Sequence, residues 1–324
     1  MTQDPRRIRI YAARRFTTAV ENALFARYDV RLNEPDTILS AVELAQAAAG
    51  CEYLFVSITE KVTYSVIETL APHLRLIATL SVGTDHIDLD AARAAGVTVM
   101  YTPNVLSAAC AEIGLLLLLN AARRGHEANA LARSGQWPGW APTQLLGLGL
   151  SGRRLGILGM GRIGREVAAR AAGFGMLIHY HNRRRLNHET EGTAVYHASA
   201  DSLLQHSDVL CICLPGGPEA AGFLNARRIE LLPRDAIVVN ISRGNVIDDD
   251  ALIGALRSGR LFAAGLDVFD GEPAINDRYR SLHNVFLTPH IGSATTETRD
   301  AMGFLLLEGI RALEAGNPPP NHIC

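Results

Sequence analysis

An arginine, a glutamate and a histidine in the last third of the chain have the types and positions that acid–base chemistry beside a carboxylate requires. Arg243 lies in a Ser-Arg-Gly turn after an apolar run, Glu272 precedes a proline and His290 follows one. A guanidinium can hold a carboxylate through two parallel hydrogen bonds, and a histidine can give up a proton near neutral pH. A neighbouring glutamate would orient the histidine and favour its charged form. Singly, each is most often a solvated turn residue, so this interpretation requires a fold that joins them.

Six residues in the middle of the chain, Gly159-Met160-Gly161-Arg162-Ile163-Gly164, follow an apolar run and precede a helical pattern. The first glycine of such a turn permits a sharp bend, the second lets the backbone approach a pyrophosphate, and the third lets helix and strand pack closely. The free N–H groups at the start of the helix then face the phosphates. We therefore expect this segment, including Arg162 and Ile163, to bind a dinucleotide. Another nucleoside-binding sheet, such as that of a methyltransferase, is the alternative.

The loop after the next apolar run, Asn182-Arg183-Arg184, indicates which dinucleotide is bound. An NAD enzyme normally carries Asp or Glu near this position to accept a hydrogen bond from the ribose 2′-OH. Asn182 removes the charge that would repel a 2′-phosphate, and Arg183 and Arg184 supply donors that match phosphate oxygens. The alternative is a solvated arginine loop, since Lys61 is the only lysine and the chain is biased toward arginine. We expect NADP to be preferred, with NAD as the weaker cofactor.

These signals require strands and helices that place them, and the first third of the chain alternates between the two. Strand, helix, strand, repeated, is the pattern of a parallel sheet covered on both faces. The expected strands are Arg6–Tyr11, Tyr53–Ile58, Leu74–Leu80 and Val97–Tyr101, and the expected helices are Thr18–Ala26, Asp36–Ala48, Lys61–Leu70 and Asp88–Ala95. A long apolar helix at Leu106–Arg124 and a stretch rich in Gly, Pro and Trp at 135–152 follow.

A second alternating series has the elements of a complete doubly wound dinucleotide domain. Its expected strands are Arg154–Leu158, Leu177–Tyr180, Val209–Leu214, Ala236–Ile241, Leu261–Leu266 and Asn284–Leu287, and its expected helices are Ile163–Ala172, Ser199–Gln205 and Asp249–Arg257. No further strand of this second series follows the last helix, Thr295–Glu314, so we expect this helix to belong to the first series. The predicted fold is α/β with two doubly wound parallel sheets. A Rossmann dinucleotide domain, residues 103–291, is inserted into a flavodoxin-like substrate domain, residues 1–102 plus 292–324, and the active site is expected between them.

In this fold Arg243, Glu272 and His290 all fall at carboxyl ends of strands, the edge where ligands bind in open α/β sheets. Reduction of a 2-oxo acid needs a cation that holds the carboxylate and polarises the carbonyl. It also needs an acid that protonates the developing alkoxide, and a partner that orients this acid. Arg243, His290 and Glu272 meet these needs in that order. Together with the dinucleotide motif, they predict an enzyme that moves a hydride on a 2-oxo or 2-hydroxy acid.

The ordered segments resemble those of the D-2-hydroxyacid dehydrogenase family over nearly the whole chain. Within the family the resemblance is closest to NADP-dependent glyoxylate/hydroxypyruvate reductases. It rests on the Asn-Arg-Arg loop, on His290-Ile291-Gly292-Ser293-Ala294-Thr295 and on Trp137-Pro138-Gly139-Trp140. The resemblance implies that Arg243, Glu272 and His290 are the catalytic residues and that a small 2-oxo acid is reduced to the D-2-hydroxy acid.

The same resemblance implies further site residues and a partner. The backbone N–H groups of Val82 and Gly83 would meet the substrate carboxylate, and a homodimer would form through the long helix at 106–124. Trp140 would reach the active site of the partner subunit, unless it is only a packed loop aromatic. The residues on the nicotinamide side would be Leu214, Pro215, Ile241, Asp267 and Gly292.

Two other functions stay open at this point. An enzyme for larger 2-oxo acids such as phenylpyruvate would keep the same catalytic residues. Dinucleotide-sensing corepressors of this fold keep them too, so the protein could bind the dinucleotide without turnover. Glu272 argues against formate oxidation, since the family relative that oxidises formate lacks this glutamate.

The composition indicates a protein without nucleic-acid or membrane partners. The formal net charge is −2, whereas a general nucleic-acid binder needs a clustered basic excess. The longest apolar run, Ile113–Leu119, is too short to span a bilayer. The chain has 5 cysteines without framework spacing, which predicts reduced thiols in the cytoplasm. Cys211 and Cys213 could share a metal from one strand, but no second ligand pair accompanies them, so no metal is expected.

Overall fold

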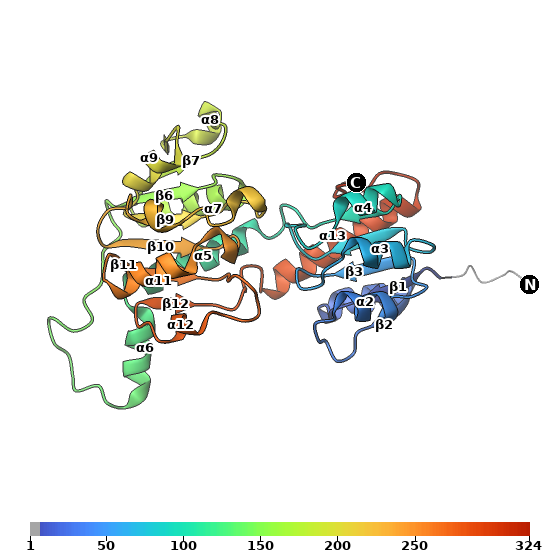
Figure 1. Ribbon diagram of the computed structural model, residues 1–324, viewed down its shortest axis with the longest axis horizontal. Helices are drawn as coiled ribbons and strands as arrows, with labels where there is room; N and C mark the ends of the chain where they lie inside the picture. Colours follow the sequence, from blue (N-terminus) through green and yellow to red (C-terminus); the bar gives the residue numbers. More distant parts are fainter. Residues whose placement is uncertain (1–6) are drawn as a thin grey trace, which may run out of the picture. The chain divides into compact units, whose positions relative to one another are not determined.

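The structure, a computed structural model, describes residues 7–324. These residues form two compact units, one made of the described residues up to Leu106 together with Ala294–Cys324, and the other made of Ser107–Ser293. Each unit contains one parallel sheet. Figure 1 shows both, with β1, β2 and β3 labelled in one unit and β6, β7, β9, β10, β11 and β12 in the other. The predicted α/β fold with two doubly wound sheets is therefore confirmed. Arg6, the first residue of the first expected strand, lies outside the described residues.

The first unit has a five-stranded sheet in the order β2-β1-β3-β4-β5, which is the flavodoxin-like order. Its strands are β1 (Arg9–Ala12), β2 (Asp29–Leu32), β3 (Tyr53–Val56), β4 (Leu76–Thr79) and β5 (Thr98–Met100). Its helices are α1 (Thr18–Arg27), α2 (Ala41–Ala47), α3 (Tyr64–Leu70), α4 (Leu89–Ala94) and α13 (Thr296–Glu314). The sequence pattern did not predict β2, whose side chains alternate between exposed and half-buried positions.

Successive residues of these strands point to opposite faces of the sheet, and each face has its own apolar core. Leu54 belongs to the core that α2, α3 and α4 cover. Its neighbour Phe55 belongs to the core that α1 and α13 cover. Helices α1 and α13 lie close together at Gly303, where a Cβ would lie 2.4 Å from Val20 Cγ2. The last helix of the chain is thus an integral part of the first unit.

The second unit has a seven-stranded sheet in the order β12-β11-β10-β9-β6-β7-β8. The strand order reverses between β6 and β9, as in the Rossmann fold. Its strands are β6 (Arg154–Leu158), β7 (Leu177–His181), β8 (Val195–Tyr196), β9 (Val209–Ile212), β10 (Ala236–Asn240), β11 (Leu261–Leu266) and β12 (Val285–Leu287). Its α-helices are α5 (Ser107–Ala122), α6 (Gly125–Ser134), α7 (Arg162–Ala172), α8 (His188–Glu191), α9 (Ala200–Gln205), α10 (Ala226–Ile229), α11 (Asp249–Arg257) and α12 (Asp277–Arg280). Two short 3₁₀ helices are η1 (Pro218–Ala220) and η2 (Gly244–Val246).

The long helix α5 packs on the second sheet, and the chain then leaves the sheet in an exposed arm, residues 125–146. A Cβ on Gly265 of β11 would lie 2.8 Å from Leu117 Cβ, so α5 lies directly against the strand there. The arm contains α6 and the segment that follows it, and none of its residues is buried. Figure 1 shows the arm extending away from the second sheet. Within residues 7–324, no helix is long and apolar enough to cross a membrane.

A histidine cluster supports β7, the strand that leads into the Asn182–Arg184 loop. The rings of His179 and His197 are joined by a 2.9 Å hydrogen bond between Nδ1 and Nε2, and His197 Nδ1 lies 2.9 Å from Ser202 Oγ. The ring of His206 lies 5.0 Å from that of His197. Burial lowers the pKa of both His179 and His197. Positive charge from Arg154 and His206 lowers the pKa of His179 further, and the neighbouring histidines do the same for His197.

We expect this cluster to make the second unit less stable in mild acid. Because the folded state lowers both pKa values below 6.5, it favours neutral rings. Their stabilisation is complete above pH 6.5 and is lost as pH falls through 6.5 toward the lowered folded values. The urea midpoint should therefore drop between about pH 7.5 and about pH 5.5. The decrease in the urea midpoint should be smaller in His179→Gln than in wild type. His73→Gln, which replaces an exposed histidine, is the control and should show the same decrease as wild type. An equal drop in all three proteins would contradict this assignment.

Candidate active site

The glycine turn between β6 and α7 is open on the side that phosphates would approach. Gly159 has φ +100°, and a Cβ there would lie 2.8 Å from the carbonyl oxygen of Cys213. A Cβ on Gly164 would lie 2.4 Å from the carbonyl oxygen of Gly159, so this glycine lets α7 pack on the turn. A Cβ on Gly161 would meet no atom within 4 Å. Gly161 is the N-cap of α7, and Arg162 and Ile163 form its first turn. The turn therefore fits a dinucleotide pyrophosphate.

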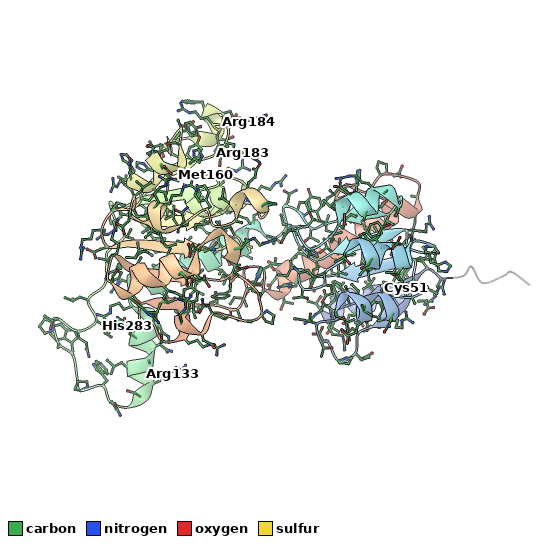
Figure 2. The ribbon with its side chains drawn as sticks, in the orientation of Figure 1. Cys51, Arg133, Met160, Arg183, Arg184 and His283 are labelled. Carbon is green, nitrogen blue, oxygen red and sulfur yellow. The ribbon has the colours of Figure 1, made fainter. Side chains whose placement is uncertain are left out.

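The loop after β7 lies beside this turn. The Met160 N–H donates to Asn182 Oδ1 at 2.7 Å. Arg183 lies 3.5 Å from Glu219 in an ion pair whose side chains are 86% and 90% exposed, and Arg184 is also exposed. Figure 2 labels Met160, Arg183 and Arg184 at one end of the second unit. An exposed ion pair of this kind contributes little free energy. Arg183 can therefore leave Glu219 and bind a phosphate with little loss of stability.

The turn that carries Arg243 is pressed against the segment that carries Glu272. A Cβ on Gly244 would lie 1.8 Å from the backbone carbon of Phe269, so only glycine fits there. The side chain of Asn240, the last residue of β10, fixes the turn from the other side. Its amide donates to the Arg243 carbonyl at 2.9 Å, and its Oδ1 accepts from the Ser242 N–H at 3.0 Å. The Arg243 guanidinium lies near enough to Glu272 for its positive charge to help lower the pKa of that carboxyl.

The buried carboxylate of Asp267 shapes the turn on which His290 sits. It accepts hydrogen bonds from Thr288 Oγ1 at 2.7 Å, from the Ile291 N–H at 2.8 Å and from the Gly292 N–H at 2.9 Å. Burial raises the pKa of Asp267, and the hydrogen bond from Thr288 opposes this rise. Within this turn His290 has φ +53°, in the left-handed region that few side chains adopt. The Asp267 contacts supply the constraint that such a conformation needs.

His290 and Glu272 form a hydrogen-bonded pair. His290 Nδ1 lies 2.7 Å from Glu272 Oε2, and the two side chains are 27% and 29% exposed. The other carboxylate oxygen, Oε1, accepts from the Phe269 N–H at 2.8 Å. Burial acts to raise the pKa of Glu272, but the bonds from His290 and Phe269 and the charge of Arg243 outweigh it and lower the pKa. Glu272 is thus a charged partner for Nδ1, and Nε2 is the ring nitrogen left to act on a substrate.

Comparison with known proteins agrees with this geometry. Residues 115–292 match the family model of the D-isomer specific 2-hydroxyacid dehydrogenase, NAD binding domain. The chain is 42% identical over 291 residues to a glycerate dehydrogenase of Hyphomicrobium methylovorum, covering 89% of this chain and 90% of that protein. It is also 42% identical over 282 residues to a glyoxylate reductase of Thermococcus litoralis, covering 86% and 85% of the two chains.

The chain belongs to the D-isomer specific 2-hydroxyacid dehydrogenase family. A solved structure from Polaromonas sp. JS6 66, described as a protein of this family, superposes with a TM-score of 0.95 at 60% identity, over 99% of this chain and 100% of that one. An NADPH-dependent glyoxylate/hydroxypyruvate reductase of Sinorhizobium meliloti, in complex with NADP and malonate, superposes with a TM-score of 0.87 at 30% identity. That match covers 98% of this chain and 97% of the reductase. The predicted family and its enzyme class are therefore confirmed.

Other expected residues of this dehydrogenase lie on the second unit. Leu214 and Pro215 follow β9, so they lie at the same edge of the sheet as the glycine turn. Ile241 follows β10 and is buried against α5, where its Cδ1 would lie 3.2 Å from a Cβ on Gly114. A Cβ on Gly292 would lie 3.3 Å from Asp267 Oδ2. Their contact with the nicotinamide stays a prediction.

Val82 and Gly83 belong to the first unit, in the loop after β4. The Ser81 hydroxyl donates to the Gly83 carbonyl at 2.7 Å, and Thr79 links Ser81 to His86 through hydrogen bonds of 2.8 and 2.9 Å. These hydrogen bonds hold the loop in place. The proposed contact of the two N–H groups with a substrate carboxylate stays a prediction, as does the role of Trp140, whose side chain is 81% exposed in the arm.

The sequence analysis assigned no role to two residues that support the candidate catalytic side chains. Asn240 anchors the Arg243 turn, and Thr288 bonds the carboxylate that holds the His290 turn. Both are polar residues at strand ends, Asn240 three residues before Arg243 and Thr288 two residues before His290. That placement was the available signal for them.

We expect Glu272→Gln to remove most of the activity with little change in cofactor binding. The amide can keep the hydrogen bond with His290, but it lacks the charge that stabilises the protonated ring. The kcat for reduction of a 2-oxo acid should fall by about 100-fold or more, while the Kd for the dinucleotide, measured by fluorescence titration, should stay within about twofold. Glu230→Gln, which removes a surface ion pair with Arg260, is the matched control. A kcat within about threefold of wild type would argue against this role for Glu272.

Proposed function

We propose that this protein reduces a small 2-oxo acid, of the glyoxylate or hydroxypyruvate type, to the D-2-hydroxy acid with NADPH as the preferred reductant. The observation that carries the proposal is the His290–Glu272 pair, 2.7 Å apart, beside the Arg243 turn and in the same unit as the glycine turn. Relatives named glyoxylate reductase and glycerate dehydrogenase support the size of the substrate.

Each catalytic side chain has a separate task in this reaction. Arg243 holds the substrate carboxylate with two parallel hydrogen bonds and polarises the adjacent carbonyl. The nicotinamide, when bound, supplies the hydride that adds to the carbonyl carbon. As the carbonyl electrons move to oxygen, His290 passes the proton of Nε2 to that oxygen, which leaves the hydroxy acid and a neutral ring. Glu272 fixes the ring through Nδ1 and stabilises its charged form before the transfer.

The two units divide the binding of the two ligands. The second unit, Ser107–Ser293, binds the dinucleotide, where residues 103–291 were expected. The first unit, the described residues up to Leu106 with Ala294–Cys324, is the substrate domain, where the N–H groups of Val82 and Gly83 add to the hold on the carboxylate. On the nicotinamide side we place Leu214, Pro215, Ile241, Asp267 and Gly292. Support comes from the match of residues 115–292 to the NAD binding domain of the family.

The preference for NADPH rests on the loop after β7. It holds a neutral side chain at Asn182, where a carboxylate would repel a 2′-phosphate, and two exposed guanidinium groups at Arg183 and Arg184. The reductase of Sinorhizobium meliloti, whose structure contains NADP, is a related protein with such a cofactor.

A substrate panel tests the proposed function. The measurement is kcat/KM for glyoxylate, hydroxypyruvate and phenylpyruvate, each with NADPH and with NADH. We expect one of the two small acids to exceed phenylpyruvate by about tenfold or more, the size discrimination that a shaped pocket achieves, and NADPH to exceed NADH. Turnover of phenylpyruvate above both small acids would reject the small substrate. Dinucleotide binding without turnover of any acid would indicate a sensor.

The exposed arm supports a homodimer in which Trp140 serves the partner's active site. Two large aromatic side chains of the arm, Trp137 and Trp140, are 56% and 81% exposed, and Leu146 is 61% exposed. Exposed apolar side chains gathered on one segment are typical of a protein–protein contact. Trp137 is bonded within the arm, since its Nε1–H donates to Gln144 at 3.1 Å, and we therefore assign the partner contact to the more exposed Trp140.

We expect the protein to sediment as a dimer and Trp140→Ala to raise the KM for the 2-oxo acid by about fivefold, the loss of an aromatic contact worth about 1 kcal/mol. Trp137→Ala, in the same arm, is the matched control and should leave KM close to wild type. A fully active monomer in sedimentation would remove this role for Trp140.

A further inference from the structure

The side chain of Asn182 contacts the glycine turn at a single residue, Met160, through both ends of its amide. Its Oδ1 accepts from the Met160 N–H at 2.7 Å, and its Nδ2 lies 3.4 Å from the Met160 carbonyl oxygen as a donor. The orientation of the amide follows from chemistry, because a backbone N–H can only donate and so must face the oxygen. Met160 itself is buried in the core beneath the turn, at 3% exposure.

These two contacts act on the peptide units on either side of Met160. The Met160 N–H belongs to the peptide that joins it to Gly159, and the Met160 carbonyl belongs to the peptide that joins it to Gly161. A trans peptide is planar and its C=O and N–H point in opposite directions. A donor on the Met160 carbonyl therefore directs the Gly161 N–H to the opposite side. Gly161 begins α7, where a Cβ would meet open space within 4 Å.

We propose that Asn182 is a positioning residue that fixes the glycine turn in its pyrophosphate-binding shape, in addition to leaving the 2′-phosphate site uncharged. The amide is bonded to both peptides around Met160, and it thereby sets the direction of the N–H at Gly161. Because the pyrophosphate is common to NADPH and NADH, this role of Asn182 serves both cofactors equally. The inference rests on the proposed function only in that the turn binds a dinucleotide.

This role explains why an aspartate would not be an equivalent residue here. The carboxylate of Asp could accept from the Met160 N–H, but it has no hydrogen to donate. Its second oxygen would face the Met160 carbonyl oxygen at the 3.4 Å where Asn182 now places an NH₂ group. Two oxygens without a hydrogen between them repel, so the Met160–Gly161 peptide would turn. The usual exchange of Asn for Asp to favour NADH would therefore disturb the turn that NADH also needs.

The test compares Asn182→Ala, Asn182→Asp and Arg183→Ala/Arg184→Ala with wild type. The Kd values for NADPH and NADH are measured by fluorescence titration. We expect Asn182→Ala to weaken both cofactors by about tenfold, the loss of one to two hydrogen bonds, with the ratio of the two Kd values unchanged. The double arginine variant should weaken NADPH and so change the ratio. Asn182→Asp should weaken NADPH and should not tighten NADH.

Hydrogen exchange in the cofactor-free protein gives a second measurement that does not depend on binding. The Met160 amide should exchange about tenfold faster in Asn182→Ala than in wild type, because its acceptor is gone. Asn187→Ala is the matched control. Asn187 lies in the same connection, where its Oδ1 accepts from the Thr190 N–H at 2.8 Å to cap α8, away from the glycine turn. It should leave both Kd values and the Met160 exchange rate at wild-type values.

The outcomes separate this inference from the proposed function. Asn182→Asp that binds NADH about fivefold more tightly than wild type would show that charge alone matters at this position, and would overturn the inference. So would Asn182→Ala with unchanged Kd values and unchanged Met160 exchange. If Asn182→Ala does not fold, the nearly isosteric Asn182→Asp decides the question. A wild-type protein that binds neither dinucleotide overturns the proposed function as well.

Discussion

The loops at the carboxyl edge of the second sheet are held in place by one buried carboxylate, that of Asp267. Buried carboxylates are costly unless hydrogen bonds compensate the lost water, and here three donors from the turn at 288–292 do so. The backbone of Asp267 adds two more bonds, since its N–H donates to the Asn240 carbonyl at 3.0 Å and its carbonyl accepts from the His290 N–H at 2.8 Å. One residue at the end of β11 thus joins the loops after β10 and β12, which carry Arg243 and His290.

Direct backbone contacts complete this edge. Gly244 lies against the backbone of Phe269, and Gly159 lies against that of Cys213. In each case two loops from different strands meet without a side chain between them. Parallel strands place their carboxyl ends at one edge, but the ends are about 5 Å apart, and side chains would push the loops away from one another. The absence of a Cβ at these positions is what lets separate loops act as one site.

The sequence predicted buried elements better than exposed ones. The bounds expected for β6, β11 and α11 agree with the structure to the residue. Strand β11 is a fully apolar run, β6 is apolar after its first residue, Arg154, and the helix has a clear apolar stripe. Strand β2 was missed since Asp29 and Arg31 occupy its exposed face. Helix α6 was not predicted, and none of its residues is buried.

The candidate catalytic residues could be singled out from the sequence, but much of what holds them in place could not. Residue type and position at strand ends were enough to single out Arg243, Glu272 and His290. Asn240 bonds backbone groups only two and three residues further along the chain, a local turn to which the sequence analysis assigned no role. The sequence analysis interpreted Asn182 only as a neutral residue where NAD enzymes carry a carboxylate. Its hydrogen bond with Met160 is visible only in the structure. The expected contributions of Val82, Gly83 and Trp140 stay predictions.

The insertion of one unit into the other has a consequence for how the protein is made. The second unit is one continuous stretch, Ser107–Ser293, and the first is completed only by Ala294–Cys324. During synthesis, the strands of the first unit emerge before α13, so the core beside Phe55 lacks Leu306, Leu307 and Ile310 until residues 294–324 have also been made. The nascent first unit therefore carries an uncovered apolar face while the second unit is produced and can already fold. Premature termination after residue 293 would leave that face open permanently, and exposed apolar surface of this kind engages chaperones or aggregates.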